Sequence, residues 1–246
     1  MTLDLRKGFH EPAEKPRRFY KAVEVAEADG GHAILLDGRR LRTPKAQPMV
    51  LPTRALADQV AEEWAAQTDV IEMARMQATR LANTAIETIG ASREAVADQV
   101  AQYAGSDLVC YFAEGPAALV GRQEAAWGPL MDRAAAEEGL AFERATGILH
   151  RPQPPQTLAR VRDIALSQDD FGLAGLAFGA ALFGSAVLAV ALLRGWRRGE
   201  EIFDLSRIDE AFQEEQWGVD EEAAERTDRL RAEARMLDRW FRGLRG

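Results

Sequence analysis

The hydrophobic pattern of the chain changes its period once, near residue 52. Between residues 19 and 51, short apolar runs alternate with polar stretches, and DGG at 29–31 and DG at 37–38 separate them. An Asp-Gly pair between apolar runs favours a tight hairpin turn. We therefore expect an antiparallel meander of three or four strands in this part of the chain.

From residue 56 onward, apolar residues recur every three or four positions, which is typical of amphipathic helices. The first stripe contains Leu56, Val60 and Trp64, and Thr53 before it is a typical N-cap residue. The same period predicts helices at 76–89, 92–103, 119–134, 157–166, 200–217 and 220–244. Gly128-Pro129 predicts a kink or a new start inside 119–134. The aromatic residues on these stripes are expected in the core: Trp64, Trp127 and Phe212.

Two short segments fit more than one structure. Residues 106–112 fit either a helix extension or a buried strand, and residues 141–149 fit a stray strand or hairpin that returns to the N-terminal sheet. The pattern as a whole predicts an α+β fold. We expect a small β-rich N-terminal domain with one covering helix at residues 1–75, in which residues 1–17 form an extended arm. A larger all-α helical bundle domain is expected at residues 76–246.

An uncharged run occupies residues 171–193. Its length would suffice to cross a bilayer. Many of its residues are Gly or Ala, however, and Gly184-Ser185 in its middle resembles a helix end followed by a new N-cap. We therefore predict two short buried helices and no stable membrane insertion, with a membrane-anchored protein as the alternative.

Charge and cysteine content restrict the class of protein further. The net charge of −8 argues against a protein that binds nucleic acid by neutralising phosphates. The single Cys110 excludes an intramolecular disulfide and a zinc site built from several thiolates. The first twenty residues lack the apolar core of a secretory signal. We expect a cytoplasmic protein with no nucleic-acid partner.

The sequence shows no arrangement that would hold a metal or a cofactor. His10, His32 and His150 are far apart and lack a second ligand at helical spacing, so no metal site is expected. The glycines at 172, 175 and 179 do not have the spacing of a dinucleotide-binding fingerprint, and no strand leads into them. No cofactor is expected.

Glu215 is out of place on its predicted helix. On a helix spanning 200–217 it lies seven residues after Ile208 and three after Phe212, so it continues the inward apolar stripe. A carboxylate in that position needs a partner, a water-filled cleft or a binding surface. Acidic residues surround it between Asp209 and Glu222. Three roles fit this cluster: a solvated face, a docking surface for a basic partner, or the acid of a hydrolase or small-molecule binding protein.

Six segments occur in a fixed order along residues 17–222: RRFYKAV, LLDGRRLRTP, VLP with a following helix that ends in AEEW, LANTAIE, SDLVCYF and IDEAFQEEQWGVDEE. Together they resemble the F1-ATPase assembly chaperones that handle the α subunit. Eukaryotic members carry a His-Asp pair after the Trp-Gly of the last segment, whereas this chain has VDEEAAE there. The resemblance therefore implies a bacterial member.

The resemblance also implies a function and a site. It indicates a non-enzymatic chaperone that binds the unassembled α subunit and covers a surface that the β subunit later takes. Glu215 and Asp220 match acidic positions that the family is thought to require, and Gln213, Trp217 and Gly218 match the signature around them. We expect these five residues to bind the partner, with the two carboxylates paired to basic residues of the α subunit.

Overall fold

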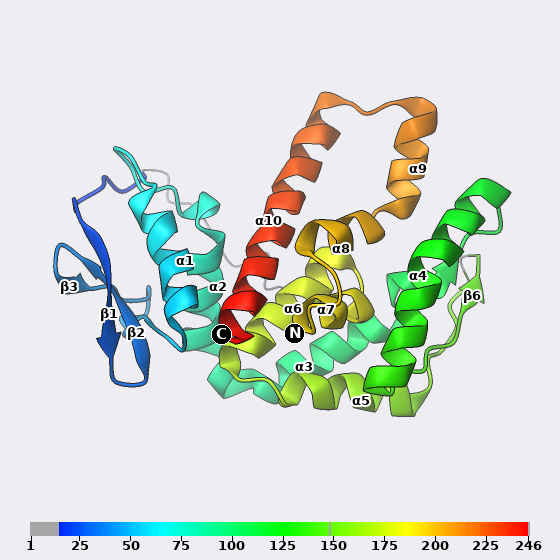
Figure 1. Ribbon diagram of the computed structural model, residues 1–246, viewed down its shortest axis with the longest axis horizontal. Coiled ribbons are helices and arrows are strands. Elements are labelled where there is room, and N and C mark those ends of the chain that lie inside the picture. Colours follow the sequence, from blue (N-terminus) through cyan, green and yellow to red (C-terminus); the bar gives the residue numbers. More distant parts are fainter. Residues whose placement is uncertain (1–14, 148, 246) are drawn as a thin grey trace.

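A small sheet lies at one end of the molecule and helices make up the rest (Figure 1). The computed structural model describes residues 15–147 and 149–245, so most of the predicted N-terminal arm lies outside the described residues. The strands are β1 (Val23–Ala28), β2 (Gly31–Leu36), β3 (Arg39–Arg40) and β4 (Val50–Leu51). They are antiparallel, in the order β1-β2-β3, and β4 also pairs with β2. The predicted meander is confirmed.

Helix α1 (Arg54–Ala65) covers one face of this sheet. The Thr53 hydroxyl accepts a hydrogen bond from the Leu56 N–H (3.2 Å) and so begins the helix, as the sequence predicts. Ile34 and Leu36 on β2 are buried in the same core as Trp64. The Tyr20 hydroxyl donates to the Trp64 carbonyl (2.7 Å), which ties the start of the sheet to the end of α1.

The opposite side of α1 packs on α10 (Glu221–Arg245), the C-terminal helix. Thr53 Oγ1 donates to the Gly243 carbonyl (2.7 Å), and Gln59 Nε2 donates to the Met236 carbonyl (3.0 Å). Helix α1 therefore joins the sheet to the helical part of the molecule. The division into domains at residues 1–75 and 76–246 stays a prediction.

The uncharged run forms two short helices, α6 (Asp170–Phe183) and α7 (Ala186–Leu193). Gly184 ends α6 in the left-handed conformation (φ 64°), and the Ser185 hydroxyl accepts from the Leu188 N–H (3.0 Å) to begin α7. Every residue of α7 is buried. The prediction of two buried helices is confirmed. Within residues 15–147 and 149–245, no helix combines the length and the apolar character needed to cross a membrane.

The Gly184→Ala variant tests the left-handed helix end. Because Gly184 has a positive φ and no neighbour within 4 Å of an added Cβ, the cost is conformational and not steric. We expect the free energy of unfolding to fall by about 1 kcal/mol. Urea unfolding measures it, with Gly121→Ala as control: Gly121 is helical and equally uncrowded, so alanine there should be neutral or stabilising. Equal effects of the two changes would contradict the explanation.

The next helices depart from the predicted boundaries. Helix α2 (Gln77–Thr84) continues through a π-helical segment, η2 (Ala85–Ile89), into α3 (Gly90–Gly105). Ser92, the predicted first residue of the helix at 92–103, forms a kink inside α3 and donates to the Thr88 carbonyl (2.7 Å), so the helix does not begin there. Helix α4 (Ala117–Glu138) continues past Pro129, so the predicted new start there is wrong.

Of the two structures that residues 106–112 could form, the strand is correct for the last two residues and the helix extension is wrong. The segment forms a 3₁₀ turn, η3 (Leu108–Cys110), and then β5 (Tyr111–Phe112). Strand β5 pairs in parallel with β6 (Ala145–Thr146), so these two strands make a separate sheet. The return of 141–149 to the N-terminal sheet is therefore absent from the described part of that segment.

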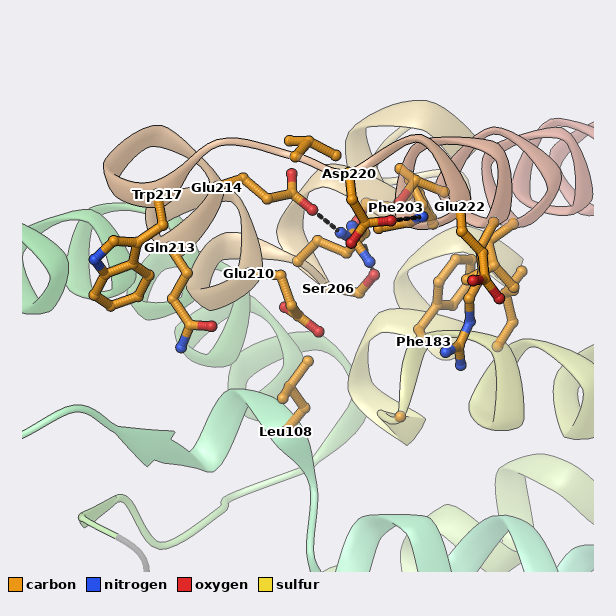
Figure 2. Close-up of a pocket in the computed structure, with 18 of the residues that line it drawn as sticks. Leu108, Phe183, Phe203, Ser206, Glu210, Gln213, Glu214, Trp217, Asp220 and Glu222 are labelled. Carbon is orange, nitrogen blue, oxygen red and sulfur yellow. Dashed lines mark hydrogen bonds and ion pairs between the residues drawn. The ribbon is translucent and has the colours of Figure 1, made fainter.

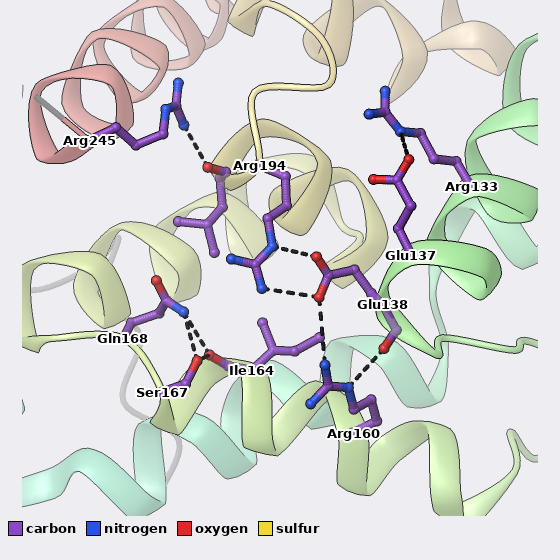
Figure 3. Close-up of polar contacts among 10 residues, drawn as sticks. Arg133, Glu137, Glu138, Arg160, Ile164, Ser167, Gln168, Arg194 and Arg245 are labelled. Carbon is purple, nitrogen blue, oxygen red and sulfur yellow. Dashed lines mark hydrogen bonds and ion pairs between the residues drawn. The ribbon is translucent and has the colours of Figure 1, made fainter.

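Helices α4, α5 (Pro155–Leu166) and α7 meet at Glu138, whose side chain is largely buried (Figure 3). Arg194 donates to both Glu138 carboxylate oxygens (2.5 and 3.0 Å), and Arg160 Nε donates to the Glu138 carbonyl (2.8 Å). This cluster fixes the C-terminal end of α4 on the helical core.

The predicted helix at 200–217 is divided into α8 (Gly199–Leu205) and α9 (Ile208–Trp217). The break lies at Ser206 and Arg207, where the Ser206 hydroxyl donates to the Phe203 carbonyl (2.7 Å) and Arg207 leaves the helical conformation (φ −128°, ψ 23°). Ile202 and Phe203 on α8 are the buried residues here, and Phe212 on α9 is only half-buried. The core assignment is correct for Trp64 and Trp127 and wrong for Phe212.

Candidate functional site

Helix α9, the turn at 218–220 and α10 form a hairpin whose turn projects from the helical body, while the C-terminal half of α10 is packed within it (Figure 1). The hairpin borders a cleft of about 780 Å³ (Figure 2). The cleft has apolar residues from four parts of the chain: Leu108, Leu182, Phe183, Phe203 and Leu230. Its charged residues are mostly acidic: Arg207, Glu210, Glu214, Asp220, Glu222 and Arg226. An apolar floor with an acidic rim suits a segment of protein that carries both apolar and basic side chains.

Helix α9 is held in place by polar contacts with α4. Gln123 Nε2 donates to Asp209 Oδ1 (2.5 Å), and Trp127 Nε1 donates to the Leu205 carbonyl just before α9 begins (2.9 Å). Further along, the guanidinium of Arg122 donates to both Glu215 oxygens (2.7 and 2.8 Å). Of the ten residues of α9, all of them described, none is buried. These contacts therefore determine where the helix lies.

Glu215 faces α4 and not the cleft. The prediction that it continues an inward apolar stripe is wrong in one respect, because its side chain is 51% exposed. The break at 206–207 lies before Ile208 and leaves the spacing of Ile208, Phe212 and Glu215 unchanged. Glu215 therefore shares a face with Phe212, as predicted, but that face is only partly covered. The hydrogen bonds from Arg122 hold the pKa of the Glu215 carboxyl below its usual value, so it is a carboxylate at neutral pH. Nothing in this arrangement supports a general acid at this position.

The turn between the two helices contains Gly218, Val219 and Asp220. Gly218 ends α9 with a positive φ of 82°, and its N–H donates to the Glu214 carbonyl (2.8 Å). Asp220 Oδ1 accepts a hydrogen bond from the Ala223 N–H (2.8 Å). Asp220 is thus the N-cap residue of α10, where a carboxylate also complements the helix dipole.

Two apolar side chains at this turn are exposed to solvent. Trp217 is 80% exposed and Val219 is 51% exposed. Large exposed apolar side chains on a stable protein often mark an interaction site. Gln213, on the same helix, also lines the cleft.

The structure brings the five expected partner-binding residues onto one hairpin but divides them between two faces. Gln213, Trp217, Gly218 and Asp220 line the cleft, whereas Glu215 lies against α4. Sequence reasoning missed Arg122, which lies 93 positions from Glu215. Arg122 carries no local signal, because an arginine on the polar face of a helix is ordinary.

Metal and thiol chemistry receive no support in the described part of the chain. No three His, Cys, Asp or Glu side chains are placed to hold a metal ion in residues 15–147 and 149–245; His10 lies outside the described residues. Cys110 is buried, and desolvation raises the pKa of its thiol, which leaves the thiolate unavailable at neutral pH.

Comparisons with known proteins identify the family. A family model described as ATP12 chaperone protein matches residues 17–135. The crystal structure of Atp12 from Paracoccus denitrificans is 42% identical in sequence, with a TM-score of 0.85 over 92% of this chain and 97% of that chain. The chain belongs to the ATP12 chaperone family.

Two further relatives agree with the ATP12 assignment. A solved structure of a protein from Agrobacterium tumefaciens is 41% identical, with a TM-score of 0.87 over 93% of this chain and 86% of that chain. Mitochondrial protein atp12 from Schizosaccharomyces pombe is 24% identical over 226 residues, which are 87% of this chain and 78% of the yeast protein. ATP12 proteins are assembly chaperones of the F1 sector of ATP synthase, so the resemblance found in the sequence motifs is confirmed.

Proposed function

We propose that this ATP12-family protein binds the unassembled α subunit of F1-ATPase and covers the surface that the β subunit later takes. The contact is made by the α9–α10 hairpin and its cleft, which carry the five expected residues: Gln213, Glu215, Trp217, Gly218 and Asp220. The observation that carries this proposal is the exposed apolar pair at the hairpin turn, Trp217 and Val219, beside a cleft with an apolar floor.

The physical basis is the one that protein interfaces share. Their buried centres are apolar, often with an aromatic anchor, and their rims are polar. Here the floor of the cleft includes Phe183 and Phe203, and the rim includes Glu210, Glu214 and Glu222. An unassembled subunit exposes an interface that aggregates unless it is covered. A chaperone with this surface needs no catalytic group, so we propose a non-enzymatic role in the cytoplasm.

Affinity capture from cells tests the proposal. The tagged protein should recover the α subunit of ATP synthase and leave the β subunit behind, because β binds where the chaperone sits. Recovery of both subunits together, or of neither, would contradict it. Cell fractionation before capture checks the cytoplasmic location.

The Trp217→Ala variant tests the apolar turn directly. We expect binding of purified α subunit to weaken by on the order of tenfold or more, since a central tryptophan is typically a hot spot. Titration calorimetry measures the dissociation constant. Phe19→Ala is the matched control, because Phe19 is also exposed (71%) but lies beside the sheet; it should bind as the unsubstituted protein does. If Phe19→Ala loses binding and Trp217→Ala does not, the α subunit binds beside the sheet and the proposed contact at the hairpin is wrong.

Fluorescence gives an independent readout of the same contact. Trp217 is the exposed tryptophan among the five in the chain, and the other four are at most 8% exposed. Quenching by acrylamide therefore reports mainly on Trp217. Quenching should decrease when the α subunit binds. The same titration with Trp217→Phe measures the signal from tryptophans of the partner, which is then subtracted.

A further inference from the structure

We infer that Glu215 and Asp220 are positioning residues of the α9–α10 hairpin, and that the α subunit contacts the apolar turn between them, at Trp217 and Val219. This inference rests on the proposed function and assigns different roles to residues within the same surface. It replaces the expectation that the two carboxylates pair with basic residues of the α subunit.

The Glu215 carboxylate already has a complete partner. Arg122 Nη1 and Nη2 donate to Glu215 Oε1 and Oε2 at 2.7 and 2.8 Å, so a single planar guanidinium occupies both oxygens. This fork geometry is the preferred one for an arginine and a carboxylate. The Arg122 guanidinium also lies over the Phe212 ring, 5.2 Å from its centroid. The charge of Glu215 is therefore already balanced within the protein, which reduces what a basic side chain of the partner would gain by pairing with it.

The pair has a structural task, because the apolar packing of α9 is partial: Ile208 packs against the core at its first turn, and Phe212 is only half-buried. Helix α9 packs mainly on α4, and none of its residues, all described, is buried. The Gln123 to Asp209 hydrogen bond fixes the first turn of the helix, and the Arg122 to Glu215 pair fixes the last. Loss of the second contact leaves the end of the helix, and hence Trp217, without a fixed position.

Asp220 performs the equivalent task at the other side of the turn. Its carboxylate accepts from the Ala223 N–H (2.8 Å), and its carbonyl accepts from the Ala224 N–H (3.0 Å). These bonds determine where α10 begins. The four residues between the two anchors are therefore held at both ends, and Gly218 alone has an open backbone with positive φ there.

The composition of the turn points to an apolar contact. Four large apolar side chains are exposed among the described residues: Phe19, Leu149, Trp217 and Val219. Only the last two lie within two positions of each other. With both flanking carboxylates already hydrogen-bonded inside the protein, the groups left to contact the α subunit at the turn are the indole and the valine. The matching partner surface is an apolar patch of the α subunit, of the kind that a subunit interface exposes before assembly.

A charge exchange distinguishes positioning from direct contact. Arg122→Glu and Glu215→Arg should each weaken binding of purified α subunit by about tenfold or more, because like charges would then face each other. The double variant restores the pair with the same summed side-chain length, and it should bind within about threefold of the unsubstituted protein. The hydrogen-exchange rate of α9 amides should increase in each single variant and return to that of the unsubstituted protein in the double variant. Gln216→Arg adds the same charge to an exposed position of α9 and should leave binding unchanged.

Asp220 provides a second test, which does not require the charge-exchanged double variant to fold. Asparagine caps helices as well as aspartate but carries no charge. Asp220→Asn should therefore keep binding, and Asp220→Ala should lose it. If the folded double variant fails to bind, or if Asp220→Asn binds no better than Asp220→Ala, the carboxylates contact the partner and the inference is overturned. If the unsubstituted protein binds no α subunit, the proposed function fails and this inference with it.

Discussion

The Trp240→Ala variant is expected to lose about 4 kcal/mol of its free energy of unfolding, the usual range for removal of a buried tryptophan. Trp240 is fully buried on α10, and its Nε1 donates to the Phe171 carbonyl (3.1 Å) at the start of α6. The facing residue is Gly175, whose added Cβ would lie 3.1 Å from the Trp240 ring. Because glycine has no side chain to move into the vacated volume, the cavity should persist.

Chemical denaturation with circular dichroism measures this loss. Trp217→Ala is the control within the same chain: Trp217 is 80% exposed, so its truncation should change stability by less than about 0.5 kcal/mol. The two variants also separate fold from function, since Trp240→Ala should bind the α subunit for as long as it stays folded. A loss below about 1 kcal/mol for Trp240→Ala would show that the Gly- and Ala-rich helices can collapse onto the cavity.

Stability is expected to depend on the protonation of Asp107, by up to about 3 kcal/mol between pH 4 and pH 7. Asp107 is fully buried at the N-terminus of α7, where it accepts hydrogen bonds from the Val109 and Val187 N–H groups (3.3 and 3.1 Å). Burial raises its pKa from 3.8 to about 6, and the hydrogen bonds from Ser185 and the backbone lower it only in part. The folded protein therefore binds this proton more tightly than the unfolded chain. The resulting stabilisation is complete below about pH 4 and is lost as the pH rises through about 6.

The Asp107→Asn variant isolates this group from the other carboxylates. Asparagine keeps an acceptor oxygen but does not titrate. The stability of the unsubstituted protein relative to Asp107→Asn should therefore fall as the pH increases from 4 to 7. A difference that stays constant, or that moves the other way, would mean that Asp107 is ionised in the folded protein throughout this range.

The elements with strong local signals could be predicted from the sequence. The Asp-Gly turns, the Thr53 cap and the Gly184-Ser185 break all appear in the structure at the expected positions, because each depends on residues within a few positions of it. The apolar stripe of α4 is equally local, and Trp127 is buried as expected.

The failures concern places where distant contacts decide the structure. Pro129 is accommodated inside α4, and β5 finds its partner in β6 more than thirty positions away. The helix at 200–217 is broken where Ser206 hydrogen-bonds back to Phe203. No glycine or proline lies at this break, so the sequence contains no helix-breaking residue that would predict it. Helical spacing correctly assigns Glu215 to the face of Phe212, but it could not show that this face is half-exposed or that Arg122 lies opposite it.

The site itself was predicted as a set of residues and not as a geometry. The motif at 208–222 lies on the α9–α10 hairpin, but it could not show that Asp220 caps α10 or that Trp217 is exposed. The floor of the cleft comes from residues as distant as Leu108 and Leu230, which a local pattern cannot bring together.

The contacts between α1 and α10 have a consequence for biosynthesis. The Thr53 and Gln59 side chains hydrogen-bond carbonyls of Gly243 and Met236, and the Leu56 side chain packs on Gly243. A chain still attached to the ribosome can form the hairpins of its sheet, but the side of α1 that packs on α10 stays uncovered until α10 has been synthesised. The core around α1 is thus completed only at a late stage of synthesis. A premature stop codon a few positions before Met236 would leave this first helix exposed to the quality-control proteases of the cell.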